Sequence, residues 1–298
     1  MQNTSFNIDQ IVGVDIGGSH IAAALVEHDQ IVNGSYCEQK LDSSANAENI
    51  LDIWISTIRN VISFSKADHP AISVAMPGPF DYVNGISLIT GMQKYEALYG
   101  LDIRTFFSDK LNIPKDKIQF SNDAKSFILG EAIGGVAKGY TNIIGITLGT
   151  GVGSATCKHL VATDMNKGSA PFKDGIVEEY LSTRWFVSRY MELTGMKIPD
   201  VKTICELNES NLYRNQLFHE FSINLSMFLD DFVQEERPDI VVIGGGIAKA
   251  SSEFLPYVHH KLRSKFPNLA IRCTSLWDNA ALIGASAAFQ IPQTKLIS

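Results

Sequence analysis

The chain carries near its start the stretch Ile11-Val12-Gly13-Val14-Asp15-Ile16-Gly17-Gly18-Ser19. An apolar, β-branched run of this kind predicts a buried strand, and the two glycines after it predict a tight turn. Because glycine has no side chain, the backbone N–H groups at Gly17 and Gly18 can come close to an anion such as phosphate. The stretch therefore predicts a strand that ends in a phosphate-binding turn.

A second stretch repeats this pattern, Ile143-Ile144-Gly145-Ile146-Thr147-Leu148-Gly149-Thr150-Gly151. Gly145 matches Gly13, and Gly149 matches Gly17. A repeat at this spacing is too long for a solenoid unit and indicates two related domains. Two glycine turns of the same kind could face each other and hold a polyphosphate from both sides.

The composition restricts the class of protein. A length of 298 residues with 45% hydrophobic residues allows one large or two medium globular domains. A net charge of −7 and a pI near 5.5 argue against a nucleic-acid-binding protein. No apolar run is long enough for a membrane span, and the polar N-terminus has no signal-peptide core. The four scattered cysteines contain no C-x-x-C pair, so we expect no disulfide framework and a reducing, cytoplasmic location.

Strands and helices are expected to alternate along the chain, which is the pattern of an α/β fold. After the first glycines the chain continues as another strand, unlike a Rossmann unit, where the glycines open a helix. Apolar stripes predict helices over residues 46–66 and 215–236. Residues 158–175 show no period and are expected to form a long loop, and one helix is expected from Glu178 through Tyr190.

Three further motifs follow predicted strands. Pro77-Gly78-Pro79 is either a stiff turn or a rigid wall beside a ligand, since ligands collect at strand ends in α/β sheets. Asn122-Asp123 is typical of a helix N-cap. Gly244-Gly245-Gly246 would allow a flat ligand to lie against the backbone, although Lys249 stands where a G-x-G-x-x-G motif would need glycine.

The order of these motifs resembles the sugar kinases of the actin, hexokinase and heat-shock chaperone superfamily, most of all the ROK family (repressors, open reading frames, kinases). The resemblance runs from Ile11 to Phe289. It rests on the ordered set Asp15-Ile16-Gly17-Gly18-Ser19, Pro77-Gly78-Pro79, Asn122-Asp123, Gly149-Thr150-Gly151-Val152-Gly153, Glu178-x-Tyr180-x-Ser182 and Gly244-Gly245-Gly246.

The resemblance implies an α/β fold of two ribonuclease-H-like (actin-like ATPase) domains that flank a deep cleft. The N-terminal domain would comprise residues 1–121 plus 278–298, and the C-terminal domain residues 122–277. Sugar would bind at the base of the cleft and Mg-ATP at its mouth. A small-molecule sugar would then be the substrate, with neither nucleic acid nor membrane as a partner, and a homodimer is a family-level expectation.

Residue roles follow from the same resemblance. The β- and γ-phosphates of ATP would be held by Asp15, Gly17, Gly18 and Ser19 from the first turn and by Gly149, Thr150 and Gly151 from the second. Asp15 would also hold Mg²⁺, through water. Adenosine would lie near Gly245 and Gly246, and the sugar would contact Asn122, Asp123, Glu178 and Gly78.

Asp123 would be the catalytic base, which the chemistry of the reaction supports. Phosphoryl transfer passes through a loose, highly charged transition state, so positioning and charge neutralisation dominate catalysis. A carboxylate beside the attacking hydroxyl orients it and accepts its proton, and an ordinary aspartate is ionised at neutral pH.

The chain also departs from the family pattern. Most members carry a G-H histidine and a C-x-C-G-x-x-G-C zinc cluster before the E-x-Y-x-S segment, but no His or Cys lies between Leu160 and Glu178. We therefore expect no zinc. Residues 166–172 replace the A-G-E-x-G-H segment that touches the sugar, so the identity of the sugar stays open. His20 stands where the family usually has lysine, and such a lone histidine is most often an ordinary loop residue.

These observations favour ATP-dependent phosphorylation of a hexose hydroxyl, as in a glucokinase. An N-acetylhexosamine kinase would differ only in the pocket for the 2-substituent. The alternative that is not an enzyme is a catalytically degenerate, sugar-binding regulator. Such a protein would need neither Asp15 nor Asp123. A DNA-binding repressor is disfavoured, because only ten residues precede Ile11.

Overall fold

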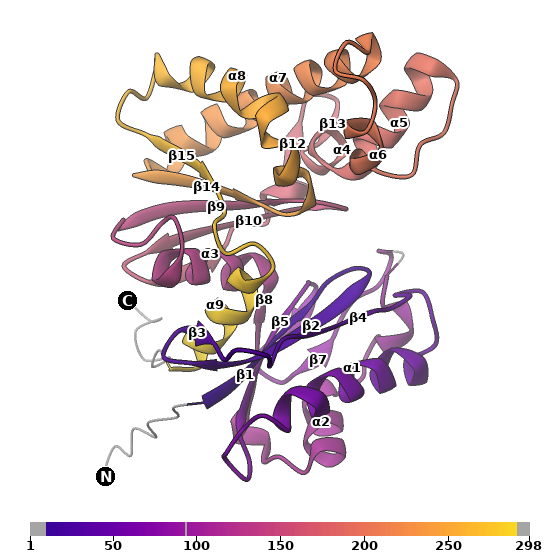
Figure 1. Ribbon diagram of the computed structural model, residues 1–298, viewed down its shortest axis with the longest axis vertical. Coiled ribbons are helices and arrows are strands. Elements are labelled where there is room, and N and C mark those ends of the chain that lie inside the picture. The colour runs from indigo at the N-terminus through magenta and orange to yellow at the C-terminus, as the bar shows by residue number, and fades with distance from the viewer. Residues whose placement is uncertain (1–9, 93, 291–298) are drawn as a thin grey trace. The chain divides into compact units, whose positions relative to one another are not determined.

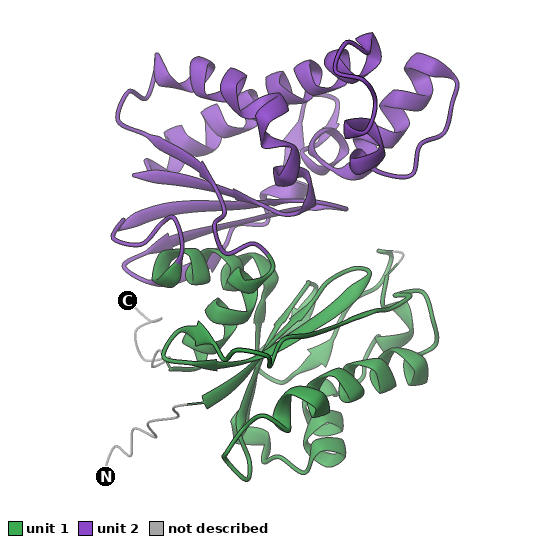
Figure 2. Ribbon diagram, in the orientation of Figure 1, with its two compact units in different colours: residues 1–134, 278–298 green, residues 135–277 purple. Residues whose placement is uncertain are grey.

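The computed structural model describes residues 10–92 and 94–290 (Figure 1). Their contacts divide the chain into unit 1, residues 1–134 and 278–298, and unit 2, residues 135–277 (Figure 2). Each unit has its own central sheet and its own hydrophobic core, which confirms the expected α/β class. Within the described ranges, no helix combines the length and the apolar character that crossing a membrane requires.

The sheet of unit 1 has the order β3-β2-β1-β5-β8, and β4 pairs with β2 beside β3. The strand β1 is antiparallel to β2 and parallel to β5, which is parallel to β8. Its strands are β1 (Gln10–Ile16), β2 (His20–Glu27), β3 (Gln30–Ile31), β4 (Cys37–Lys40), β5 (Ala71–Met76) and β8 (Ile118–Asn122). The first glycine turn therefore closes a β-hairpin, as the sequence predicted.

The two faces of this sheet carry side chains of different size. Because successive strand residues point to opposite faces, Val12, Val14 and Ile16 share one face. They pack in the main core with α1 (Ala47–Ile62) and α2 (Ile103–Leu111). The opposite face is lined by small residues, and α9 (Asn279–Gln290) packs on it next to α3 (Asp123–Gly134).

Gly13 shows why that face must carry small residues. A Cβ on Gly13 would lie 2.5 Å from the carbonyl oxygen of Leu282 and 2.9 Å from the hydroxyl of Ser286, both in α9. The hydroxyl of Ser73 donates a hydrogen bond of 2.6 Å to the carbonyl of Ala285. The glycine in the opening stretch therefore lets a helix from the far end of the chain approach β1.

The connection from β5 to β8 contains short elements. These are β6 (Phe80–Asp81), which pairs with β7 (Ile86–Ser87), then η1 (Glu96–Leu98), α2 and η2 (Lys115–Lys117). Aromatic rings fill the core beneath them, with Trp54 edge-on to Tyr95 and to Phe107.

The sheet of unit 2 repeats the topology of unit 1. Its order is β11-β10-β9-β14-β15, with antiparallel pairs on the hairpin side and parallel pairs from β9 onward. Its strands are β9 (Asn142–Leu148), β10 (Val152–Lys158), β11 (Val161–Asp164), β14 (Ile240–Gly244) and β15 (Ala270–Cys273). The internal repeat read from the sequence thus corresponds to two sheets of the same topology.

Two expectations for unit 2 were wrong. Residues 158–175 are not one loop, because they contain β11, η3 (Lys167–Ser169), β12 (Pro171–Phe172) and the start of β13 (Gly175–Ile176). The expected single helix is broken into α4 (Glu178–Leu181) and α5 (Thr183–Thr194) by Ser182, which has the extended backbone φ −112°, ψ 169°. The remaining elements are α6 (Val201–Cys205), α7 (Leu212–Glu236), η4 (Gly246–Ala250) and α8 (Ser251–Arg263).

Candidate functional site

In unit 1, the predicted site residues gather at one edge of the sheet. Asp15 of β1 pairs with Ala75 of β5, which pairs with Ser121 of β8. Because these strands are parallel, their carboxyl ends meet at the same edge. The first glycine turn, Gly78 and Asn122-Asp123 all follow that edge directly. Ligands of α/β sheets bind at such edges.

Three carboxylates come close together there. Asp15 lies two residues after Gly13 and therefore on the face that α3 and α9 cover. Asp123 is the first residue of α3, and Asp278 immediately precedes α9. Desolvation by burial, together with the negative charges of Asp123 and then Asp278, raises the pKa of Asp15 to about 7. The edge therefore favours a positive charge.

The first glycine turn is held from two sides. The N–H of Gly17 donates to the carbonyl of His20 at 3.0 Å, and its carbonyl accepts a hydrogen bond from the hydroxyl of Tyr95. A Cβ on Gly17 would lie 2.8 Å from Cε1 of the His20 ring, so glycine lets this imidazole lie against the turn. Gly18 is partly exposed and Ser19 is exposed, which leaves the tip of the turn accessible.

Asn122 caps α3 and is oriented by its neighbours. Its side-chain oxygen accepts from the N–H of Lys125 at 3.1 Å, as the N-cap interpretation predicted. Its NH₂ group donates to the hydroxyl of Tyr82 at 3.4 Å, and that hydroxyl donates to the carbonyl of Met76 at 3.0 Å. The cap uses the amide oxygen, so Asn122 would meet a substrate hydroxyl mainly as a donor.

Asp123 and Gly78 lie beside Asn122. One carboxylate oxygen of Asp123 accepts from the N–H of Ala124 at 2.8 Å, and the residue is partly exposed. Gly78 follows β5, and its peptide bond to Pro79 is cis. A Cβ on Gly78 would lie 3.4 Å from the hydroxyl of Tyr82, so Gly78, Tyr82 and Asn122 form one contiguous group.

In unit 2, the second glycine turn is tied to Glu178. The N–H of Gly149 donates to the carbonyl of Gly151 at 3.0 Å, and the N–H of Val152 donates to Oε2 of Glu178 at 3.0 Å. A Cβ on Gly151 would overlap the Glu178 carboxylate. The other carboxylate oxygen forms an ion pair with Arg184. Glu178 therefore lies against the turn, where Thr150 is exposed.

The third glycine motif lies at the neighbouring strand end. Gly244 of β14 pairs with Thr147 of β9. Gly245 has φ +84°, a conformation that favours glycine, and a Cβ there would overlap the backbone of Leu148. Gly246 is exposed, and a Cβ on it would meet no heavy atom within 4 Å among the described residues. This edge thus presents bare backbone beside the second turn.

The structure thus forms two groups of the predicted residues, one per unit. Three side chains that interact with these groups were not predicted from the sequence. They are Asp278, Tyr95 and Arg184. Asp278 could have been found, because the helix that it precedes was expected to return to the first domain. The other two stand in no recognisable motif, and only the folded chain brings them to Gly17 and Glu178.

The comparison with protein families decides the assignment of the chain. The model of the ROK family matches residues 11–291, which is nearly the whole chain. The chain belongs to the ROK family. The predicted resemblance is therefore confirmed.

Individual ROK proteins are similar to it at low identity. A glucokinase from Thermotoga maritima is 27% identical over 150 residues, which cover 50% of this chain and 45%, less than half, of that enzyme. An N-acetyl-D-glucosamine kinase from Mannheimia succiniciproducens is 23% identical over 94% of this chain and 99% of its own length. The ROK glucokinase of Streptomyces griseus, solved with glucose and AMPPNP, has a TM-score of 0.78 and 20% identity over 94% of this chain and 98% of that one. At this identity the structural likeness shows a shared fold.

Proposed function

We propose that this ROK protein is an ATP-dependent sugar kinase that phosphorylates a hexose hydroxyl, as a glucokinase does. One observation carries the proposal: Asp123, at the start of α3, lies at the same sheet edge as Asp15 and the first glycine turn. This neighbourhood supports Asp123 as the base for the acceptor hydroxyl and the first glycine turn as the binding site for the phosphates of the donor. A kinase needs both, and a protein that only binds sugar needs neither.

The unit 1 groups divide the chemistry between them. Asp123 accepts the proton of the attacking hydroxyl and orients its oxygen toward the γ-phosphate. Asn122 donates from its NH₂ group to a neighbouring sugar hydroxyl, since its oxygen is used by the helix cap. Gly78 offers backbone without a side chain beside these two residues, and Glu178 of unit 2 accepts from further hydroxyls.

The nucleotide is bound by residues of both units in this proposal. Backbone N–H groups at Gly17, Gly18 and Ser19 and at Gly149, Thr150 and Gly151 neutralise the phosphate oxygens. Gly245 and Gly246 adjoin adenosine, for which their exposed backbone leaves room. Domain boundaries at residues 121 and 278 remain the sequence-based expectation for the two lobes.

Magnesium fits the acidic edge of unit 1. Burial and the charges of Asp123 and Asp278 raise the pKa of Asp15, and a cation bound there would offset these effects. Among the described residues, no cluster of three His, Cys, Asp or Glu side chains could ligate a metal directly. In this proposal Mg²⁺ keeps several of its waters and binds through Asp15 and substrate phosphates. Bound there, Mg²⁺ would neutralise charge on the transferring phosphoryl group.

The sugar could also be an N-acetylhexosamine, which the similarity to an N-acetyl-D-glucosamine kinase over most of both chains favours. We propose that the protein acts in the cytoplasm on a small-molecule sugar, without nucleic acid or membrane, and as a homodimer. The absence of zinc stays a prediction, which metal analysis of the purified protein checks.

The test is sugar-dependent ADP release, measured with a panel of hexoses and N-acetylhexosamines. We expect one sugar to stimulate turnover, and Asp123→Asn to lower kcat by about 10²–10⁴-fold because general base catalysis contributes that much. Asp116→Asn, an exposed carboxylate of η2, is the matched control and should keep full activity. Sugar binding without turnover by any sugar would instead make the protein a regulator.

A further inference from the structure

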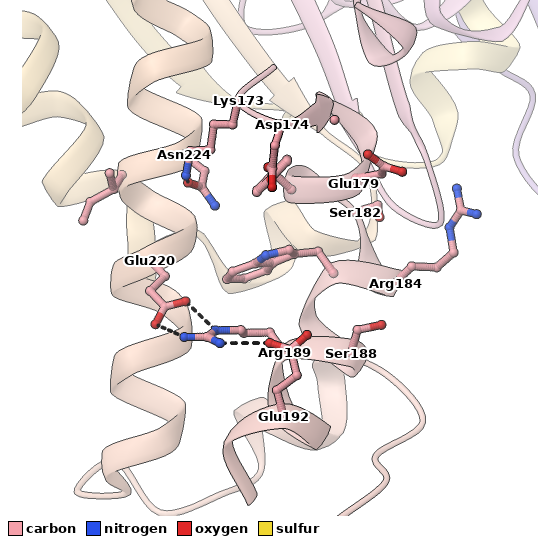
Figure 3. Close-up of a pocket in the computed structure, with 14 residues that line it drawn as sticks. Lys173, Asp174, Glu179, Ser182, Arg184, Ser188, Arg189, Glu192, Glu220 and Asn224 are labelled. Carbon is pink, nitrogen blue, oxygen red and sulfur yellow. Dashed lines mark hydrogen bonds and ion pairs between the residues drawn. The ribbon is translucent and has the colours of Figure 1, made fainter. Parts of the chain in front are cut away.

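Unit 2 contains a cavity of about 720 Å³ that none of the proposed catalytic residues lines (Figure 3). Its walls come from the β12–β13 turn, α4, α5 and α7. Cavities of this size accommodate small molecules. Glu178 contacts the second glycine turn, whereas the next two residues of α4, Glu179 and Tyr180, line the cavity. The cavity therefore adjoins the group around that turn, and Arg184, which pairs with Glu178, belongs to both.

The cations of this cavity are already paired. Arg189 donates to both oxygens of Glu220 at 2.8 and 3.1 Å and to Glu192 at 2.9 Å, as the dashed lines in Figure 3 show. Lys173 donates to the side-chain oxygen of Asn224 at 2.5 Å. Arg184 forms its ion pair with Glu178. A phosphate or carboxylate ligand would have to compete with the carboxylates that already bind Arg184 and Arg189.

The remaining carboxylates are also engaged. Asp174 accepts from the hydroxyl of Tyr180, which holds the pKa of Asp174 below its usual range. Glu179 accepts from the N–H of Ile176 at 3.0 Å. Lys173 lies close enough to Asp174 for its charge to lower the pKa of Asp174 further. Charges of both signs therefore neighbour each other on this wall, and no patch of one sign among the described residues favours a cation or an anion.

Neutral groups are what the cavity still offers. Ser182 is 0% exposed, and its hydroxyl has no hydrogen-bond partner among the described residues, nor does it cap α5. A buried hydroxyl without a partner is unfavourable, so a ligand that bonds to it gains affinity. Ser188 adds an exposed hydroxyl, and Asn224 still has its NH₂ group as a donor. The Trp185 ring, packed edge-on to Phe186, supplies an apolar wall.

We propose that this cavity binds a neutral, polyhydroxylated molecule of monosaccharide size. Hydroxyls of such a ligand pair with the serine and amide groups, and its C–H face packs on the indole. The site adjoins the second glycine turn, because Thr183, next to Ser182, donates from its N–H to the carbonyl of Gly149 at 2.7 Å. Binding of a ligand in the cavity is therefore expected to affect the conformation of the second glycine turn.

The test is calorimetric titration with D-glucose and with N-acetyl-D-glucosamine, each on the full chain carrying Asp123→Ala. Because the proposed kinase site also binds sugar, we expect two binding events per chain. Ser188→Phe fills the cavity from an exposed position and should weaken one of the two events at least tenfold. Met191→Phe, on the same helix but outside the cavity, is the matched control and should change nothing. Ser182→Ala should weaken binding in the cavity about fivefold, the value of one hydrogen bond, while the Tm of the free protein does not fall, because an unpaired buried hydroxyl is removed.

Kinase activity is measured separately and should survive Ser188→Phe, so failure of the proposed kinase function would leave this test intact. Three results overturn the proposal. They are sugar binding that is unaffected by Ser188→Phe, binding of inorganic phosphate where neither sugar binds, and concentration-dependent dimerisation that Ser188→Phe abolishes.

Discussion

At the scale of single residues, the negative charge of Asp15 is expected to lower the stability of the folded protein. Its carboxylate is desolvated and lies near two other acidic side chains, so the folded protein holds its proton up to a pH of about 7. In the unfolded chain an aspartate loses its proton near pH 4. Between these values the unfolded state releases a proton that the folded state keeps. The contribution of Asp15 to stability therefore falls as the pH rises from about 4 to about 7.

Asp15→Asn should accordingly stabilise the protein at pH 8 in EDTA, by on the order of 2 kcal/mol, since each pKa unit corresponds to about 1.4 kcal/mol and partial exposure reduces the effect. At pH 4 most of the gain should disappear, because the carboxyl is then protonated in the folded state and about half protonated in the unfolded state. Urea unfolding at the two pH values measures it, with Asp116→Asn as control. A variant no more stable than the wild type at pH 8 would contradict this account. Magnesium-dependent turnover should be lost in the same variant.

At the scale of secondary structure, the crossing of α3 and α9 depends on glycine. A Cβ on Gly284 of α9 would overlap the carbonyl of Ser126 in α3 and lie 2.6 Å from the backbone nitrogen of Gly130. Both contacts are backbone, so no side-chain rotation can relieve them. Gly284→Ala should destabilise the protein by about 3 kcal/mol, the upper part of the range for overpacking.

The same urea unfolding experiment measures this loss. Gly246→Ala is the control, because its Cβ would point into open space among the described residues and it should leave stability within about 0.5 kcal/mol. Equal stability of the two variants would show that the helices can move apart.

Local sequence patterns predicted the elements that depend on neighbouring residues. They did not predict contacts between residues that lie far apart in the chain. The hairpin around the first glycine turn, the helix over residues 46–66 and the cap at Asn122 depend on neighbouring residues, and all of them form. The break at Ser182 was missed because the apolar spacing continues through it. The hydroxyl of Tyr95 reaches Gly17 across the core, which no local pattern reports. The identity of a sugar substrate could not be predicted, because residues 166–172 do not match the A-G-E-x-G-H pattern that the family resemblance leads us to expect.

At the scale of the whole molecule, the two units share a topology but differ in chain continuity. Unit 2 is one continuous segment, which contains its whole sheet and the helices of its core. Unit 1 depends on α9 from the far end of the chain, since α9 covers the face that carries Gly13, Ala24 and Ala75. Residues 1–134 alone would leave that face in water.

The fragment of residues 135–277 should therefore fold cooperatively, with sharp near-ultraviolet circular dichroism and a single unfolding transition. The fragment of residues 1–134 should lack fixed tertiary packing, because its small-residue face has no helix to cover it and burial of apolar surface is the main stabilising term. Joining residues 278–298 to residue 134 through a flexible linker should restore folding, since a linker adds little entropic cost. An independently folded fragment of residues 1–134 would show instead that α3 alone can cover the sheet, and that α9 serves mainly to return Asp278 to the acidic edge.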